Sequence, residues 1–303
     1  MPPVARVRVC IVSWNAKDDL RACLHSLATA CKNPADIEAV VVDNASSDGS
    51  ADMVAAEFPD VTLVRLTENT GFSGGNNVAL EGLTAPYAFL LNSDAVVYPG
   101  ELDAFLDFAD ATPDAGLIGP KVLNPDGSIQ YSCRRWPTFA AGLYRNVWLG
   151  KLFPGNKPAS DYLMQDFDHA SVLDVDWLSG CALMIRKTCL QRIGPLDAAT
   201  FFMYCEDMDW SLRAHNDGWR VLFFPGCTVT HKIGASSDGA AERMIWEHSK
   251  SMWRFYKKHA DFFQDRVPAL ARPLIPVGIW LRAVVRVSRR RLSPPKKDWR
   301  TKK

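Results

Sequence analysis

The sequence predicts an α/β fold in which helices flank a mostly parallel central sheet and a helical extension follows at the C-terminus. Two observations carry this prediction. Short apolar runs alternate with segments of helical spacing through the first third of the chain. The apolar runs are also nearly continuous, as in strands that are buried on both faces. With 303 residues, 48% of them hydrophobic, the chain can form about two domains or one large domain with extensions.

The expected strands are short runs rich in β-branched and other apolar residues, at 7–12, 37–42, 61–66 and 87–91. Helices are expected where apolar residues recur every three or four positions, around 20–27, 53–58, 78–83 and 101–111. The glycine-rich segment 71–77 is predicted to be a loop. A repeated strand-helix order requires crossovers between parallel strands. Beyond Leu117 prolines interrupt the pattern, and we expect a mixed continuation of the sheet.

Charge is distributed unevenly, although the formal net charge is only +1. Eleven basic residues and a single acid, Asp298, lie between Arg272 and Lys303, so the rest of the chain is mildly acidic. This argues against nucleic acid as a partner and for a local contact with an anionic surface. The stretch 267–287, which ends just before the densest run of basic residues, is apolar but contains three arginines and three prolines. It is therefore expected to lie on a bilayer surface rather than span it, the alternative being a helix packed on the body.

The eight cysteines form no CxxC pair and have no regular spacing. Neither a zinc ribbon nor a disulfide framework is indicated, and reduced thiols in the cytosol fit best. The first residues also lack the apolar core and cleavage site of a secretory signal, so export is not expected.

Polar clusters follow three of the expected strands, at 13–15, 43–50 and 92–94. Ligands of open α/β sheets bind at the carboxyl ends of the strands, where these clusters should meet. Each cluster alone could be a turn or a helix cap, but their joint placement predicts a ligand site. The segment 69–77 adds three glycines, which let the backbone approach a phosphate. It matches neither GxGxxG nor a Walker loop, which disfavours nicotinamide cofactors and nucleoside triphosphatases.

The sequence resembles a known family, the inverting family 2 glycosyltransferases, in the branch that includes bacterial rhamnosyltransferases. The resemblance rests on seven strings in the family's order: VCIVSWN, VVVDNASSDGS, NTGFSGGNN, FLLNSD, WLSGCALMIRK, FMYCEDMDWSLR and VTHKIGAS. It implies a GT-A fold, a nucleotide-sugar donor, a divalent cation at a DxD-like motif and one carboxylate base. The corresponding domain division is a GT-A domain at 1–240, with a nucleotide-binding half at about 1–120 and a catalytic half at about 121–240. A helical segment, expected at the membrane surface, follows at 241–287, and a disordered basic tail is expected at 288–303.

For the donor, the resemblance places Asp43 at the acid that hydrogen-bonds the pyrimidine base, with Ser13 and Asn15 beside the nucleotide. Asn69, Gly74 and Asn76 match the loop over the ribose and diphosphate. Asn92-Ser93-Asp94 stands at the DxD position but begins with an amide. Magnesium or manganese can bind one or two carboxylates plus substrate phosphates, so Asp94 could suffice.

His231 follows an expected strand at 221–224. It matches a family histidine that can reach the metal or the diphosphate, although a lone histidine is more often structural. Glu206-Asp207 matches the family's ED motif, which assigns the base to Asp207 with Glu206 beside it. The alternative is a purely structural role, in which both acids stabilise a helix N-terminus. Asp209 and Arg213 form an i,i+4 pair that is expected to be structural.

The favoured activity is transfer of rhamnose from dTDP-rhamnose to a glycan or polyprenyl-linked saccharide, in wall or surface polysaccharide synthesis. The expected location is the cytoplasm, at the cytoplasmic face of the membrane. One alternative is a nucleotidyltransferase, but the segment after the first strand, VSWNAKDDL, lacks its glycine-rich loop. Another is a non-catalytic nucleotide-binding or membrane scaffold protein. A transferase requires Asp94 and Asp207 to face one cleft.

Overall fold

The structure is a computed structural model that describes residues 4–138, 141, 157–232, 241–264 and 266–292. Its first half alternates strands and helices as expected, and the predicted strands and most predicted helices are confirmed. In chain order the elements are β1 (Val7–Ser13), α1 (Lys17–Ala30), η1 (Pro34–Asp36), β2 (Ile37–Asp43), α2 (Ser50–Glu57), β3 (Thr62–Arg65), α3 (Gly71–Leu80), β4 (Tyr87–Leu91), β5 (Ala95–Val97) and α4 (Glu101–Ala111).

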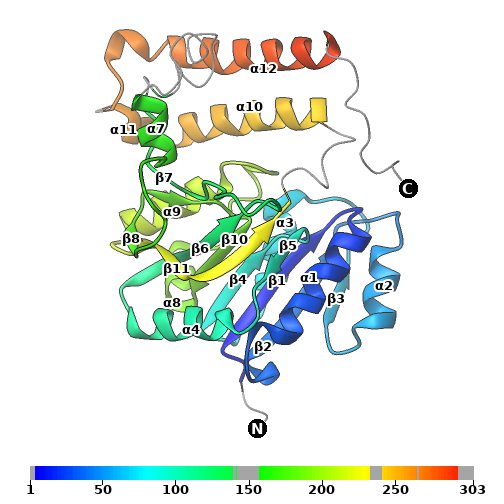
Figure 1. Cartoon of the computed structure of the whole chain (residues 1–303). Helices are drawn as coiled ribbons and strands as arrows, with labels where there is room; N and C mark the ends of the chain where they lie inside the picture. The colour runs from blue at the N-terminus through cyan, green and yellow to red at the C-terminus, as the bar shows by residue number, and fades with distance from the viewer. Residues whose placement is uncertain (1–3, 139–140, 142–156, 233–240, 265, 293–303) are drawn as a thin grey trace.

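The second half continues the same sheet. Its elements are β6 (Ala115–Leu123), β7 (Cys133–Arg134), α7 (Lys157–Leu163), β8 (Leu173–Asp174), β9 (Trp177–Leu178), β10 (Ala182–Arg186), α8 (Lys187–Ile193), α9 (Glu206–Asn216) and β11 (Arg220–His231). The strand order is β3-β2-β1-β4-β10-β6-β11-β5, with β8 also paired to β11. Strands β3, β2, β1 and β4 are parallel, whereas β10 runs antiparallel to both β4 and β6. The predicted mixed continuation is thus present (Figure 1).

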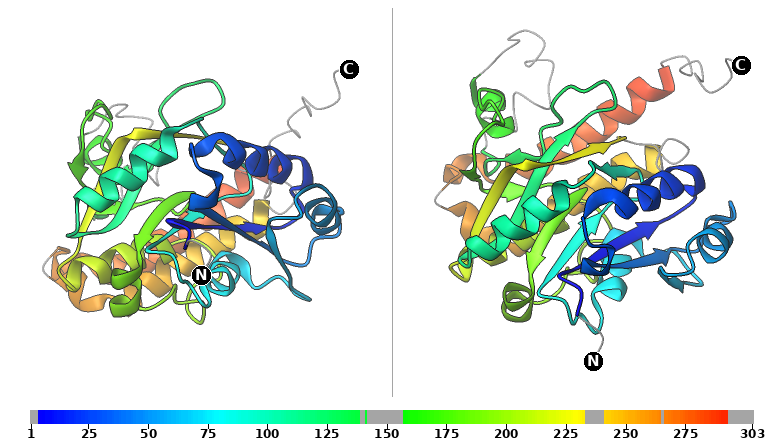
Figure 2. Two further views of the ribbon diagram at one scale, coloured as in Figure 1. Left: turned by 90° about the horizontal axis from the view of Figure 1, so that it is seen from below. Right: turned by 60° about the horizontal axis from the view of Figure 1, so that its bottom comes forward.

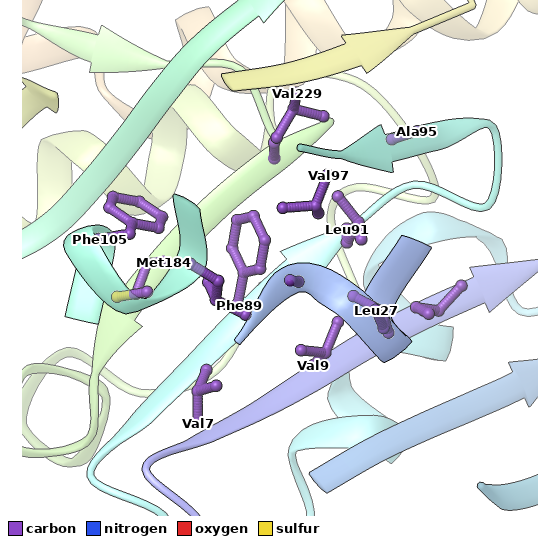
Figure 3. Packing of buried hydrophobic residues seen from close by; sticks show 14 of the residues in the cluster. Val7, Val9, Leu27, Phe89, Leu91, Ala95, Val97, Phe105, Met184 and Val229 are labelled. Carbon is purple, nitrogen blue, oxygen red and sulfur yellow. The ribbon is translucent and has the colours of Figure 1, made fainter. Parts of the chain in front are cut away.

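The sheet has a hydrophobic core on each face. On one face α1 and α4 cover β1 and β4, where Val9, Leu27, Phe89 and Phe105 pack together (Figure 3). On the other face a second cluster includes Trp210 of α9 together with residues of β4 and β10. All eight cysteines are described, and each is a buried free thiol. The two cores hold the carboxyl ends of the parallel strands rigidly at one edge of the sheet.

Helix α3 corrects the prediction of a loop at 71–77. The helix begins at Gly71 because polar side chains serve its first turn: the N–H of Gly71 donates to Asn69 Oδ1 at 2.9 Å, and the N–H of Thr70 donates to Asn44 Oδ1 at 2.8 Å. The glycines that suggested a loop allow close packing instead. A Cβ added at Gly75 would lie 2.7 Å from Val12 Cγ1, so only glycine lets α3 approach β1 this closely.

Strand β11 extends well beyond the predicted 221–224. The Pro225-Gly226 pair that indicates a strand end lies in an irregularity of the pairing with β6, where the register shifts between Phe224 and Thr228. A bulge absorbs such residues without ending the strand. The strand therefore continues to His231, which pairs with Ala95 of β5.

The C-terminal segment contains α10 (Ala241–Lys258), α11 (Ala260–Gln264), η3 (Ala269–Ala271) and α12 (Leu274–Leu292). Helix α10 lies between the sheet domain and α12 in two views (Figures 1 and 2). Phe255 and Phe263 pack with Met208 and Leu212 of α9, which joins the extension to the sheet domain. Helix α12 reaches five residues into the segment predicted as a disordered tail, because its helical pattern continues to Leu292. The boundary at 240 and residues 293–303 lie outside the described residues.

Candidate active site

A pocket of about 340 Å³ opens at the carboxyl ends of the parallel strands. Its walls come from the three predicted polar clusters, from the start of α9, from the end of β11 and from the first turn of α10. Among the predicted site residues, the pocket brings together Asn69, Asn92, Asp94, Glu206, Asp207 and His231. A transferase requires Asp94 and Asp207 to face one cleft, and both residues line this pocket.

Asp94 and His231 form a buried pair at one side of the pocket. His231 Nε2 lies 3.3 Å from Asp94 Oδ1 and 3.1 Å from Asn92 Nδ2. The pairing of β5 with β11 brings these segments together. In the described part of the chain, no three or more His, Cys, Asp or Glu side chains gather as a metal site. The protein can therefore offer one carboxylate and one imidazole, a set that suits Mn²⁺ or Mg²⁺ when substrate oxygens supply the other ligands.

Glu206 and Asp207 are the first two residues of α9 and so lie at a helix N-terminus. Asp207 Oδ2 accepts the N–H of Gly180 at 3.0 Å, and its Oδ1 accepts the N–H of Met208 at 2.8 Å. Glu206 is 4% exposed, and its Oε2 has no hydrogen-bond partner within the described ranges. The two carboxylates thus have different surroundings although they are adjacent.

These surroundings affect the pKa of the two acids differently. Burial, and then the negative charge of Asp207, raise the pKa of Glu206 well above its usual range. Burial also raises the pKa of Asp207, but the N–H groups of Gly180 and Met208 and the charge of Arg134 oppose this. Glu206 therefore retains the proton more strongly, and Asp207 is the member of the pair able to act as an anionic base.

Replacing Glu206 with Gln is expected to stabilise the fold progressively as pH rises. A group whose folded pKa is raised contributes its full stability below the unfolded pKa of a glutamate, and that contribution is lost as pH rises through the folded pKa. Glutamine mimics the protonated acid and removes the loss. Denaturant unfolding of both proteins over a pH series should show a difference in unfolding free energy that grows from acid to neutral pH. A constant difference would show that Glu206 does not retain its proton on folding.

Asp43 and Ser13 are register partners on β2 and β1, next to the pocket in sequence but outside its lining. Asp43 Oδ2 accepts the N–H of Ser46 at 3.0 Å. Asp43 Oδ1 and Ser13 Oγ are buried and have no partner among the described residues. Unpartnered buried oxygens are costly, and a ligand N–H would satisfy the free Asp43 oxygen.

Three other residues predicted to bind the nucleotide-sugar donor, Asn15, Asn76 and Gly74, do not line the pocket. Each makes a local structural contact instead. Asn15 Oδ1 accepts the N–H of Ser47 at 2.8 Å. Asn76 is buried inside α3 and donates to the carbonyl of Phe72 at 2.9 Å. A Cβ added at Gly74 would lie 2.7 Å from Thr70 Cβ. Their residue types are explained by local geometry in this structure.

Other pocket residues were missed by the sequence analysis. Asn44 joins the second cluster to α3, because its Nδ2 donates to the carbonyl of Gly71 at 2.9 Å. Phe202 and Tyr204 also line the pocket and lie within the matched string FMYCEDMDWSLR, although no role was assigned to them. Arg243 lines the pocket from a segment with no motif, and its guanidinium lies 5.9 Å from the ring centre of Phe202. Asn44 could have been found from its position beside Asp43.

A buried charge network holds α9 in place. Asp209 is fully buried and accepts from Arg213 Nε at 2.9 Å, which confirms the predicted i,i+4 pair. Its Oδ1 also lies 2.7 Å from His259 Nε2 and 2.7 Å from Lys258 Nζ. Burial opposes ionisation of Asp209, but these hydrogen bonds and charges lower its pKa. The network ties the helix that carries Asp207 to the end of α10.

Comparison with known proteins agrees with this geometry. The family model described as "Glycosyl transferase family 2" matches residues 8–165, slightly more than half of the chain. An N-acetylglucosaminyl-diphospho-decaprenol L-rhamnosyltransferase of Mycobacterium tuberculosis is 28% identical over 93% of this chain and 95% of its own length. A polyprenol monophosphomannose synthase of Mycolicibacterium smegmatis is 28% identical over 77% of this chain and 81% of its own.

Two solved structures share the fold at low sequence identity. TarS of S. aureus (its residues 1–349) superposes with a TM-score of 0.55 at 14% identity, covering 92% of this chain and 81% of that one. GalNAc-T7, solved with UDP, GalNAc and Mn²⁺, gives a TM-score of 0.56 at 14% identity, covering 76% of this chain and 44% of that one. The GT-A architecture expected from the sequence is thereby confirmed. On the family match and the fold together, this chain is a glycosyltransferase that belongs to family 2.

Proposed function

We propose that this chain transfers a sugar, with L-rhamnose from dTDP-rhamnose as the favoured donor, to a saccharide carried on a polyprenyl diphosphate, with inversion. The observation that carries this proposal is the shared pocket, where Asp94 and His231 lie on one side and Asp207 lines the same space. Two relatives whose names include decaprenyl- or polyprenyl-linked sugars support the acceptor class.

In this proposal Asp207 takes the proton of the acceptor hydroxyl. The acceptor oxygen then forms its bond to the anomeric carbon of the donor sugar while the bond from that carbon to the diphosphate breaks, and the nucleoside diphosphate leaves. Attack opposite the leaving group inverts the anomeric carbon, and one carboxylate is enough for this reaction. The N–H groups of Gly180 and Met208 hold the Asp207 carboxylate in position. A divalent cation held by Asp94 and His231 would neutralise the leaving diphosphate.

For the donor base, we propose that Asp43 Oδ1 accepts the N3–H of the pyrimidine. This oxygen is buried and has no partner in the part of the chain that the structure describes, and thymine and uracil both present such an N–H. Asn69 lines the pocket and also supports the start of α3, which is expected to lie beside the ribose and diphosphate.

A donor screen tests the activity. The full chain is incubated with dTDP-rhamnose, UDP-N-acetylglucosamine or GDP-mannose, with an N-acetylglucosaminyl-diphospholipid acceptor and with Mg²⁺, Mn²⁺ or chelator. We expect acceptor-dependent release of dTDP from dTDP-rhamnose. Release from another donor alone would overturn the donor assignment, and release from none of them with any cation would overturn the proposed transfer to this acceptor.

We also propose that the chain works at the cytoplasmic face of the membrane as a peripheral protein. No described helix is long and apolar enough to cross a bilayer. Helix α12 nevertheless has an apolar outer stripe formed by Leu274, Val277, Leu281 and Val284, each about half exposed. Its opposite side buries Ile279, Ala283 and Val287, and α12 packs on α10 (Figure 1).

The charge of this region matches an anionic lipid surface. Residues 267–292 contain no acid and six arginines, five of them within α12. Arg291 pairs with Glu242 at 2.8 Å, and Glu242 precedes the pocket residue Arg243. The basic end of α12 therefore lies beside the pocket-lining turn of α10. An enzyme that docked through α12 would hold its pocket near the headgroups that carry a lipid-linked acceptor.

Replacing Val277 and Leu281 with Glu is expected to weaken binding to anionic vesicles by at least about tenfold, since the variant loses apolar burial and adds repelled charge. Vesicle sedimentation with the full chain measures this. Val172→Glu, at another exposed apolar position that lies on the body, is the matched control and should bind normally. Unchanged vesicle binding of the double variant would contradict the proposal, and loss of self-association instead would assign the stripe to a second copy of the chain.

A further inference from the structure

The far side of the His231 ring makes a contact that the proposed mechanism does not use. His231 Nδ1 lies 2.7 Å from Oε1 of Gln130. Gln130 follows β6, and its backbone N–H donates to the carbonyl of Val122 at 2.9 Å. A glutamine from a separate segment thus supports the histidine from behind, away from Asp94.

The orientation of the Gln130 carboxamide is determined by its partners. Its Nε2 lies 3.1 Å from the backbone carbonyl of His231 and 3.0 Å from Asn124 Oδ1. A backbone carbonyl only accepts hydrogen bonds, so the NH₂ group of Gln130 must face it. The carboxamide oxygen then faces the imidazole. Because this oxygen is also only an acceptor, Nδ1 of His231 must carry a proton.

A proton on Nδ1 determines what the other ring nitrogen, Nε2, can bind. In the neutral ring Nε2 holds the lone pair, and it points toward Asn92 Nδ2 at 3.1 Å and Asp94 Oδ1 at 3.3 Å. The Asn92 amide can donate to this lone pair while no cation is bound. A lone pair and a carboxylate oxygen at this separation repel each other unless a proton on Nε2 or a metal cation lies between them. A divalent cation in that place would be held by both groups.

We propose that Gln130 is a positioning residue that fixes the Nδ1–H tautomer of His231, so that Nε2 and Asp94 Oδ1 are offered together to a divalent cation. This inference rests on the cation site of the proposed function. It adds a specific requirement, an acceptor at position 130, which neither the family resemblance nor the comparisons assign. Loss of such an outer partner typically weakens metal affinity by about 10- to 100-fold.

The test begins with the unmodified full chain labelled with ¹⁵N-histidine, without metal and at alkaline pH. The His231 signals are identified by their absence in His231→Asn. We expect ¹⁵N shifts of a protonated Nδ1 and an unprotonated Nε2. A ring protonated at Nε2 would overturn the proposal, whether or not the protein binds a cation. Failure of this inference is therefore distinguishable from failure of the proposed activity.

The second arm measures Mn²⁺ affinity by calorimetry with saturating dTDP present, because substrate oxygens are needed to complete the ligand set. Gln130→Met removes the acceptor and should raise the Kd by about 10- to 100-fold, with loss of the tautomer preference. Gln130→Glu keeps an acceptor for Nδ1–H but loses both amide donors to the His231 carbonyl and Asn124. It should therefore keep the Nδ1–H tautomer and bind Mn²⁺ more tightly than Gln130→Met, whereas a merely structural role predicts a loss at least as large. Gln165→Met, at an exposed glutamine, is the matched control. Unchanged Mn²⁺ affinity in Gln130→Met, or no Mn²⁺ binding by the unmodified chain, would overturn the proposed role in cation binding.

Discussion

Replacing Asp207 with Asn is expected to lower kcat by about 10²- to 10⁴-fold, the contribution of a correctly placed general base. The carboxamide oxygen can still accept the N–H of Gly180, which joins α9 to a separate segment, and only the contact with the neighbouring N–H of Met208 is lost. The start of α9 should therefore stay in place. What is lost is the anionic oxygen that takes the acceptor proton. Nucleoside diphosphate release under saturating donor and acceptor measures the effect, and calorimetry with donor alone should give an unchanged Kd.

Glu206→Gln is the matched control for this variant, since it alters the neighbouring acid of the same buried pair. Because Glu206 is expected to be protonated, its amide should leave kcat within a few-fold of the unmodified enzyme. Equal losses in the two variants would indicate that the pair acts as a structural unit at the helix start. Full turnover in Asp207→Asn would remove Asp207 as the base.

Replacing Asp94 with Asn is expected to lower kcat/KM by about 10²- to 10³-fold, comparable to the loss of one group that stabilises developing charge. Asp94 is the single carboxylate of the Asn92-Ser93-Asp94 motif, and it lies 3.3 Å from His231 Nε2. Its loss leaves only the imidazole to hold a cation near the diphosphate. Calorimetry with Mn²⁺ and assays over a range of Mn²⁺ concentration measure the loss.

Asn92→Asp provides the contrasting variant, because it places an acid at the first position of the same motif. We expect tighter Mn²⁺ binding than in the unmodified chain, since a second hard oxygen ligand is added. If Asp94→Asn bound Mn²⁺ normally and kept full activity, the proposed cation site at Asp94 and His231 would be wrong.

Much of the fold could be predicted from local pattern. The predicted strand at 87–91 coincides with β4, and the helix expected at 101–111 coincides with α4. Errors arose where tertiary contacts override composition. Helix α3 is rich in glycine because Gly75 packs against Val12, and the long β11 passes through Pro225-Gly226 by a change of register. Neither contact has a signature within its own segment.

The candidate site was predictable where the ends of strands carry polar residues, and less so where distant segments meet. Asp94, Asp207 and His231 line one pocket as the resemblance implies, and their catalytic roles stay predictions. Gln130 gave no signal, because its contact with His231 joins residues 101 positions apart. The same holds for Arg243, which reaches the pocket only because α10 packs across the sheet domain.

A crystal structure of the full chain with dTDP and Mn²⁺ would show whether the donor site, the cation site and the base share one pocket. We expect thymine N3 within hydrogen-bond distance of Asp43 Oδ1, the cation and diphosphate beside Asp94 and His231, and open space for a sugar between the diphosphate and Asp207. Nucleotide bound elsewhere, or a diphosphate that points away from the Asp207 side of the pocket, would contradict this expectation.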